Sequence, residues 1–189
     1  MNLDLFIEEI NTECSMLGNP SLSIEAIKVD AEGVNSLKYK LCQNELKSCD
    51  YIKFTENKIY FIEFSDLYEQ LNNLRTLSTV IRNSNISDNE KIALNRNKVI
   101  IKEPTVIKNE LQSKISESLL LFQLIADNCD ITEHIEKNKI FFIALCKTVI
   151  ADIIMFDRIL REIQKKFRTV INIEMMEYLK LENYIEANS

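Results

Sequence analysis

The sequence predicts an α/β protein with a mixed central sheet flanked by helices. Glycine and proline are scarce, with two of each in 189 residues, and so few turn formers favour long regular elements. Short runs of aromatic and β-branched residues also alternate with segments of helical periodicity, which is typical of layered α/β architecture. Residues 139–146 lack polar alternation and predict a central strand covered on both faces. We expect one domain over residues 1–189, because no repeat or low-complexity linker divides the chain.

The first part of the chain is expected to form an N-terminal helical region over residues 1–30. Apolar residues at helical spacing predict an amphipathic helix over 3–17, which ends at Gly18. Residues 21–28 fit either a strand or a helix. A further helix is expected over 34–47, where apolar residues recur at helical spacing.

A β-hairpin is the next expected element and the most informative one. The runs 49–54 and 60–65 are rich in aromatic and β-branched residues, as strands are. A four-residue loop at 55–58 would place Asp50 opposite Glu63, with both carboxylates on one face at the open end. A three-residue loop would shift the register and separate them. The other opposing pairs of the four-residue register are Ile52 with Phe61 and Phe54 with Ile59.

A helical insertion is expected over residues 65–105. Apolar residues at helical spacing predict a long helix over 66–82, with Ser65 or Asp66 as its cap. The sequence Ser-Asp-Asn-Glu at 87–90 is a capping-box pattern that opens a second, shorter helix.

The remaining segments alternate between strands and helices, and residues 31–64 and 106–175 together are expected to form the core. In chain order we expect a short strand at 99–101, a helix at 106–126, a polar loop at 128–138, the buried strand at 139–146, a helix at 151–167, an edge strand at 169–174 and a closing helix at 175–185.

The charge balance bears on the class of partner. The chain carries 23 basic and 29 acidic residues, a formal net charge of −6. Nonspecific attraction to nucleic acid depends on lysine and arginine neutralising phosphates, so this balance opposes it unless a local basic patch exists. The acidic balance favours a protein partner or a homo-oligomer.

Other patterns bound the setting. The apolar stretch 140–160 is interrupted by charged residues, so we expect no membrane span. The N-terminal segment lacks a basic n-region, so no signal peptide is expected. Five cysteines without a C-x-x-C pair indicate reduced thiols in a cytoplasmic protein. His134 is the single histidine, which argues against zinc and against a histidine-based catalytic scheme.

The two facing acids, Asp50 and Glu63, indicate a site for a hard divalent cation such as Mg²⁺, which prefers carboxylate oxygens. The alternative is that both are solvated residues at strand ends. The sequence around them, Cys-Asp followed by an apolar run and then an apolar run ending in Glu, resembles the hairpin of the PD-(D/E)XK nuclease superfamily, the restriction-endonuclease-like fold. That resemblance implies a mixed sheet between helices.

In this superfamily the first acid begins one core strand and the second lies near the end of the next strand, in Glu-x-Lys. Asp50 matches the first acid and Glu63 the second, but Ser65 stands where the lysine is expected. The resemblance implies phosphodiester hydrolysis of nucleic acid with Mg²⁺ held by the two acids. Glu32 and Glu45 are candidates for a third acid.

A catalytic cation is still needed near the developing negative charge, and serine cannot supply it. The lysine has moved to a neighbouring element in some members of the superfamily. Lys108 and Lys114, on the following core helix, are therefore the candidates here. The alternative is that both are solvent-facing helix lysines.

Three functions remain open from the sequence. The first is a metal-dependent nuclease, with a bacterial antiviral defence system as its setting by analogy. The second is a catalytically inactive nuclease scaffold that serves as a protein-interaction subunit. The third is an unrelated α/β interaction protein, in which the helix at 66–82 forms a partner surface.

Overall fold

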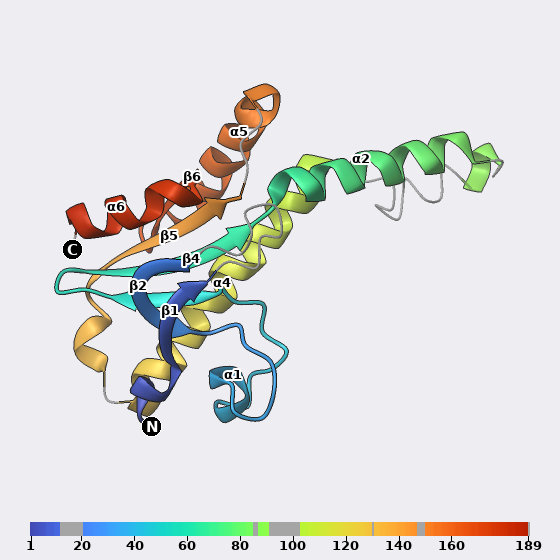
Figure 1. Cartoon of the computed structure of the whole chain (residues 1–189). Helices are drawn as coiled ribbons and strands as arrows, with labels where there is room; N and C mark the ends of the chain where they lie inside the picture. The colour runs from blue at the N-terminus through green and yellow to red at the C-terminus, as the bar shows by residue number, and fades with distance from the viewer. Residues whose placement is uncertain (12–20, 85–86, 91–102, 130, 147–149, 189) are drawn as a thin grey trace.

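A computed structural model describes residues 1–11, 21–84, 87–90, 103–129, 131–146 and 150–188. These residues form a mixed α/β fold, in which helices cover an open six-stranded sheet (Figure 1), and this confirms the predicted class. The strands are β1 (Ile7–Asn11), β2 (Ser21–Lys28), β3 (Tyr51–Phe54), β4 (Lys58–Ser65), β5 (Asn138–Leu145) and β6 (Asn172–Glu177). The α-helices are α1 (Leu37–Lys40), α2 (Leu67–Asn83), α4 (Glu103–Cys129), α5 (Ile150–Phe167) and α6 (Tyr178–Asn188).

The strands lie in the sheet in chain order, β1-β2-β3-β4-β5-β6. The first four form an antiparallel meander, whereas β4, β5 and β6 are parallel to one another. Parallel neighbours need crossover connections, and α5 provides the one between β5 and β6. The strand β4 therefore has an antiparallel neighbour on one side and a parallel neighbour on the other.

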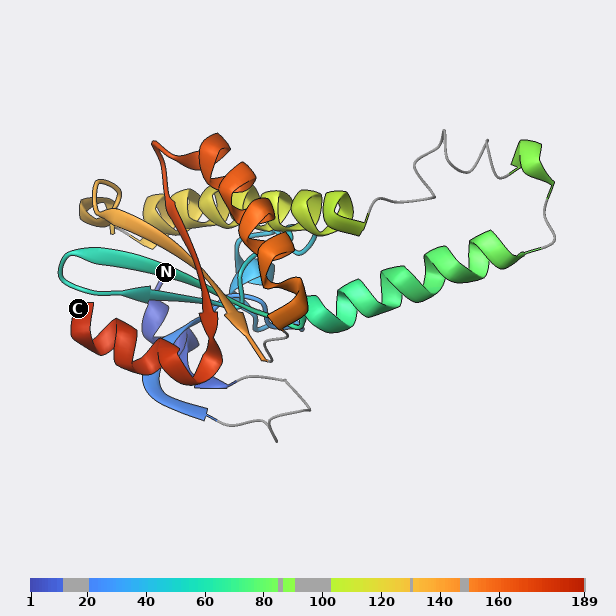
Figure 2. The ribbon, with the colours of Figure 1, turned by 90° about the horizontal axis from the view of Figure 1, so that it is seen from above.

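Helices cover both faces of the sheet, and each face has its own core. Helices α4 and α5 cover one face, and α6 covers the other (Figure 2). Side chains alternate across β4, so Ile59 and Phe61 pack beneath α4 while Tyr60 and Ile62 pack beneath α6. All four side chains are fully buried, as expected of a strand in the middle of a three-layer fold.

The hairpin has the register expected from a four-residue loop. Phe54 lies opposite Ile59 and Ile52 opposite Phe61. The next residue outward on β3 is Tyr51, opposite Ile62. This register brings the start of β3 beside the second half of β4, where the two acids were expected to face each other.

The long helices and the buried strand also agree with the sequence. Residues 66–82 and 151–167 correspond to α2 and α5, and the strand expected at 139–146 is β5, paired in parallel on both sides. The helix expected at 106–126 is longer, since α4 begins at Glu103. Pro104 lies in its first turn, where a missing N–H costs no intrahelical hydrogen bond.

Two helix predictions were wrong. Residues 3–6 form a short 3-10 helix and residues 7–11 form β1, so the described part of the N-terminal region contains no α-helix. Pairing with β2 outweighs the helical spacing of a few apolar residues. The predicted helix at 34–47 is a single turn, α1, which ends where Cys42 takes a positive φ of 57°. The ambiguous segment 21–28 is a strand with alternating burial.

Smaller differences concern the last strand and helix. The edge strand expected at 169–174 is β6, at 172–177, and the closing helix follows it directly as α6. The capping box is confirmed, because the Ser87 and Glu90 side chains each bond the backbone N–H of the other residue. The strand expected at 99–101 lies outside the described residues.

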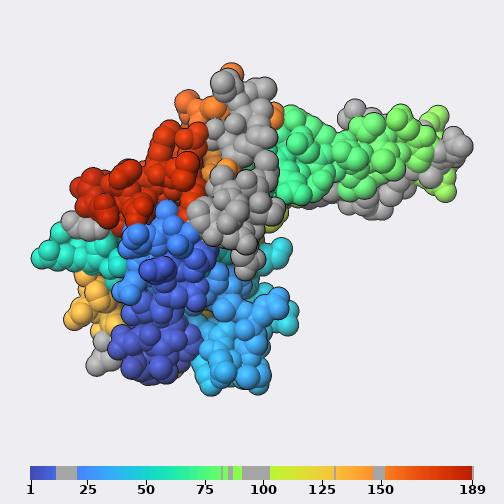
Figure 3. Space-filling model, viewed as in Figure 1, coloured from blue at the N-terminus to red at the C-terminus, as the bar shows by residue number. Residues whose placement is uncertain are grey.

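Helix α2 projects from the body of the molecule, as both the ribbon and the space-filling view show (Figures 1 and 3). Its first turns are buried, and Tyr68 packs edge-on against Phe156 of α5 with ring centroids 5.1 Å apart. Arg75 also pairs with Asp152 of α5 at 2.8 Å. Further along, Val80 is 61% exposed. Among the described helices, none is both long enough and apolar enough to cross a bilayer.

Candidate active site

The candidate site lies at the open end of the hairpin, where the backbone of Asp50 holds three strands together. The Asp50 N–H donates to the carbonyl of Ile62 on β4 at 2.9 Å. The Asp50 carbonyl in turn accepts the N–H of Val29 at 2.8 Å and that of Asp30 at 3.3 Å, just after β2. The main chain at Asp50 is therefore fixed on both sides.

The carboxylate of Asp50 turns toward β4. Its Oδ2 atom accepts a hydrogen bond of 2.7 Å from the N–H of Phe64. Phe64 follows Glu63, so this bond brings the Asp50 carboxylate next to the second acid. The hairpin thus brings the two predicted acids together.

Glu63 is an unusual residue for the middle of a buried sheet, because only 2% of its side chain is exposed. It lies two residues beyond Phe61 and therefore points to the same face, beneath α4. Its Oε1 atom forms an ion pair with Nζ of Lys114 on α4. Its Oε2 atom is buried and has no hydrogen-bond partner in the described part of the chain.

Lys114 reaches the acids because α4 is fixed against the sheet at this point. Buried residues Leu111, Ile115 and Ser118 form the inner face of the helix here, and Lys114 lies beside them, with 22% of its side chain exposed. The Ser118 hydroxyl donates to the carbonyl of Lys114 at 2.6 Å and accepts the N–H of Cys49 at 2.8 Å. One serine therefore links the helix turn that carries Lys114 to the residue before Asp50.

Burial dominates the electrostatics of the site. Burial, and then the charge of Asp50, raise the pKa of Glu63 to about 8 despite the Lys114 ammonium. Burial also raises the pKa of Asp50, although the Phe64 N–H and Lys114 oppose it. Burial works against the charged form of Lys114, but the Glu63 carboxylate outweighs it and raises the pKa of Lys114. The two carboxyl groups therefore hold protons more tightly than they would in water, and Lys114 keeps its positive charge beside Glu63.

A second acid–lysine pair, which the sequence did not indicate, lies beside the first. Asp30 lies two residues beyond the end of β2, and its charge contributes to the raised pKa of both Asp50 and Glu63. Lys38, which is 8% exposed, bonds the Asp30 carboxylate at 2.5 Å and the carbonyl of Leu46 at 2.8 Å. Sequence reasoning missed both residues because their pairing depends on how the loop after β2 places Asp30 beside α1, which no local pattern in the sequence reports.

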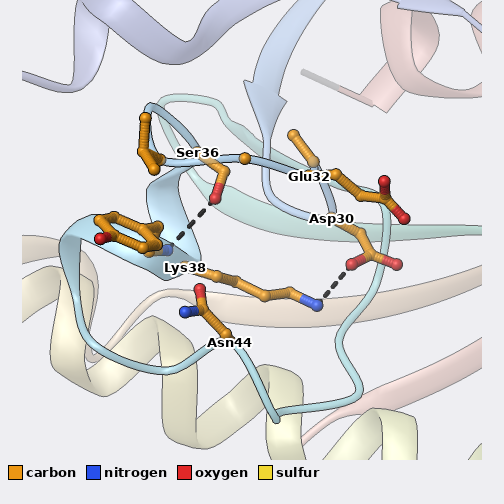
Figure 4. Close-up of a pocket in the computed structure, with 9 residues that line it drawn as sticks. Asp30, Glu32, Ser36, Lys38 and Asn44 are labelled. Carbon is orange, nitrogen blue, oxygen red and sulfur yellow. Dashed lines mark hydrogen bonds and ion pairs between the residues drawn. The ribbon is translucent and has the colours of Figure 1, made fainter.

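Asp30 and Lys38 also line a pocket formed by the loop after β2 and by α1. In Figure 4, the Lys38 side chain extends across this pocket toward Asp30, while the Glu32 carboxylate points away from Lys38. The pocket also contains Ser36, whose hydroxyl accepts the N–H of Tyr39 at 3.2 Å. This pocket adjoins the acids through Asp30.

The remaining candidate residues are more peripheral. Lys108 pairs with Glu162 of α5 at 2.9 Å, and so is engaged away from the acids. Glu45 is exposed on the loop before β3. Ser65 is buried at the end of β4, and Asp66 rather than Ser65 caps α2 by accepting the N–H of Glu69 at 2.9 Å.

The side chains at the site offer few oxygen ligands for Mg²⁺. In the described ranges, no group of three or more His, Cys, Asp or Glu side chains is arranged to hold a metal ion. Mg²⁺ is often bound through one or two carboxylates, with water and substrate phosphate completing the shell. The free, buried Oε2 of Glu63 and the nearby Asp50 carboxylate suit that mode. The donor set fits a cation that is only partly coordinated by protein.

Comparisons of this chain with protein-family models, with curated proteins and with solved structures return no match. The resemblance to the PD-(D/E)XK superfamily therefore depends on the residues of the hairpin and on the geometry around them.

Proposed function

We propose that this protein is a metal-dependent nuclease of restriction-endonuclease-like descent, which hydrolyses phosphodiester bonds at Asp50, Glu63 and Lys114. The observation that supports this most strongly is the ion pair between Lys114 and Glu63. A lysine that is remote in sequence meets the second acid of the hairpin, although the expected lysine position is Ser65. Solvent-facing helix lysines do not share a buried carboxylate in this way.

The chain's own residues would divide the chemistry as follows. Asp50 and Glu63 would hold Mg²⁺, which when bound polarises a phosphate and lowers the pKa of an attacking water. Lys114 would donate hydrogen bonds to the phosphate oxygens, where negative charge develops. The sheet and α4 bury Glu63, and low solvent access strengthens each of these electrostatic interactions.

The direct test is a cleavage assay on single- and double-stranded DNA and RNA with Mg²⁺ or Mn²⁺. Asp50→Asn, Glu63→Gln and Lys114→Met should each reduce the cleavage rate by roughly 10² or more, the usual effect of removing a group that stabilises the transition state. Lys108→Met is the matched control on the same helix and should cleave as the wild type does, because Lys108 is engaged by Glu162. Cleavage that survives in both acid variants would refute the assignment.

A second candidate function is that of a protein-interaction subunit on the same scaffold. The observation that favours it is the projecting helix α2, on which Leu77 is 49% and Val80 61% exposed. The net charge of −6 also favours a protein partner over bulk nucleic acid. Wild-type protein that cleaves none of the four substrates with either metal would favour this function.

A further inference from the structure

We propose that Lys114 is a resident counter-ion of Glu63, and that it couples the entry of a divalent cation to the entry of a nucleic-acid phosphate. This inference rests on the proposed nuclease function and assigns a regulatory property to the same site. Lys114 opposes the uptake of metal alone, and the arriving phosphate draws its ammonium away from the acid.

Lys114 is already paired with the Glu63 carboxylate, which the metal needs as a ligand. Nζ of Lys114 is bonded to Oε1 of Glu63, and Glu63 is 98% enclosed by protein. A cation on the remaining oxygen of Glu63, or beside Asp50, would lie within a few ångströms of the ammonium. Two like charges at that distance in a buried site repel strongly, because little water screens them.

The net charge of the site also favours joint binding of metal and phosphate. Asp50, Glu63 and Lys114 together carry one net negative charge when all are ionised. A divalent cation converts this to one net positive charge, and a phosphodiester, which carries one negative charge, neutralises it. Metal and phosphate together therefore leave the buried site neutral, whereas metal alone does not.

The neighbouring charges are mostly paired with one another, but they still act on the site: Asp30 raises the pKa of both acids, Lys28 lowers that of Asp50, and Glu110 raises that of Lys114. Asp30 and Lys38 are paired with each other at 2.5 Å. Lys28 lies over the ring of Tyr51, with Nζ 4.3 Å from the centroid, and Tyr51 belongs to the opposite core. On that face Glu8 accepts the Tyr51 hydroxyl at 2.9 Å and is a further charge near Lys28.

Lys114 can move while its backbone stays in place. The Ser118 hydroxyl and the buried face of α4 fix the main chain at this turn. The side chain, however, is 22% exposed and ends in an ammonium on a flexible four-carbon stem. Rotation of that stem would carry the ammonium from the carboxylate toward solvent, from which a phosphate would arrive.

Removing the charge of Lys114 should strengthen metal binding in the absence of nucleic acid, even though the same change should slow cleavage. In the wild type, nucleic acid should strengthen metal binding, and by linkage the metal should strengthen nucleic-acid binding by the same factor.

The test measures Ca²⁺ and Mg²⁺ affinity by calorimetry. The pH is about 9, so that the Glu63 carboxyl is ionised and pairs with Lys114 rather than binding a proton. Lys114→Met and Lys114→Gln should bind Ca²⁺ at least about tenfold more tightly than the wild type, within the usual range of coupling between sites. Lys108→Met, the control on the same helix, should leave the affinity unchanged. Thermal unfolding of each variant confirms that it folds.

A second arm adds a short single-stranded DNA, the RNA of the same sequence and the corresponding duplex DNA, with Ca²⁺ as the cation. At least one of these should tighten Ca²⁺ binding by the wild type and leave Lys114→Met unaffected. Equal Ca²⁺ affinity in the wild type and both Lys114 variants would overturn the coupling alone. Absence of Ca²⁺ and Mg²⁺ binding in every protein, with and without nucleic acid, would overturn the proposed metal site itself.

Discussion

At the scale of single residues, Glu63 is a side chain whose burial costs stability. A carboxylate on the central strand of a buried sheet loses its hydration, and only one of its two oxygens has a partner among the described residues. An apolar residue at this position would stabilise the protein more. Costly polar groups of this kind gather at functional sites, where they serve binding or chemistry rather than stability.

Glu63 should therefore make stability depend on pH. Its folded-state pKa, about 8, lies above its ordinary value of 4.5, so the folded state holds a proton that the unfolded state has released. The stability associated with that proton is complete below about pH 4.5 and is lost as the pH rises through about 8.

We expect Glu63→Gln to abolish most of this loss. As the pH rises from about 5 to about 9, the wild type should lose stability that the variant keeps. The difference should amount to a few kcal/mol at most, since one pKa unit corresponds to about 1.4 kcal/mol. Urea unfolding at the two pH values measures the change. Parallel pH profiles for the two proteins would show that Glu63 is not held protonated in the fold.

At the scale of the elements, the sequence was most informative where one element carries its own pattern. The hairpin, α2, α5 and β5 were all predicted from local periodicity and composition. The register of the hairpin followed from the length of one loop. These elements agree with the structure because local propensity and tertiary packing favour the same conformation.

The failures have a shared physical cause. Residues 7–11 form β1 because β2 offers them a partner strand, and residues 41–47 leave the helical conformation to connect α1 with β3. Both outcomes depend on segments distant in the fold, which periodicity in a single sequence does not report. The pair of Asp30 and Lys38 was missed for a similar reason, because it depends on the loop that joins β2 to α1.

Ser118 connects α4 with the segment that leads into β3. Ser118 is fully buried and joins the two elements through the Cys49 N–H and the Lys114 carbonyl. Ser118→Ala leaves the buried Cys49 N–H without its acceptor, which should cost about 1–3 kcal/mol of stability. Chemical denaturation measures this cost.

The matched control is Ser116→Ala, because Ser116 is exposed on the same helix. Its effect should stay within about 0.5 kcal/mol, as for most surface substitutions. If both variants were equally stable, the serine bridge would contribute nothing to the placement of Lys114.

At the scale of the whole molecule, the candidate site depends on the complete fold. Asp50 immediately precedes β3, Glu63 lies on β4 and Lys114 comes from a helix about fifty residues further along the chain. The sequence predicted the two acids as a pair, because a hairpin is local. It offered Lys108 and Lys114 as equal candidates for the cation, and only the packing of α4 on the sheet distinguishes between them.

The central claim is that Asp50 and Glu63 share a divalent cation, with Lys114 at its side. A crystal structure of the protein with Mn²⁺ and a short nucleic acid, analysed by anomalous scattering, tests this most directly. We predict one metal peak within about 2–2.5 Å of an oxygen of both acids, with the Lys114 ammonium displaced from Glu63 onto a phosphate. A metal bound elsewhere, or Lys114 still paired with Glu63 and no metal at the acids, would contradict the account.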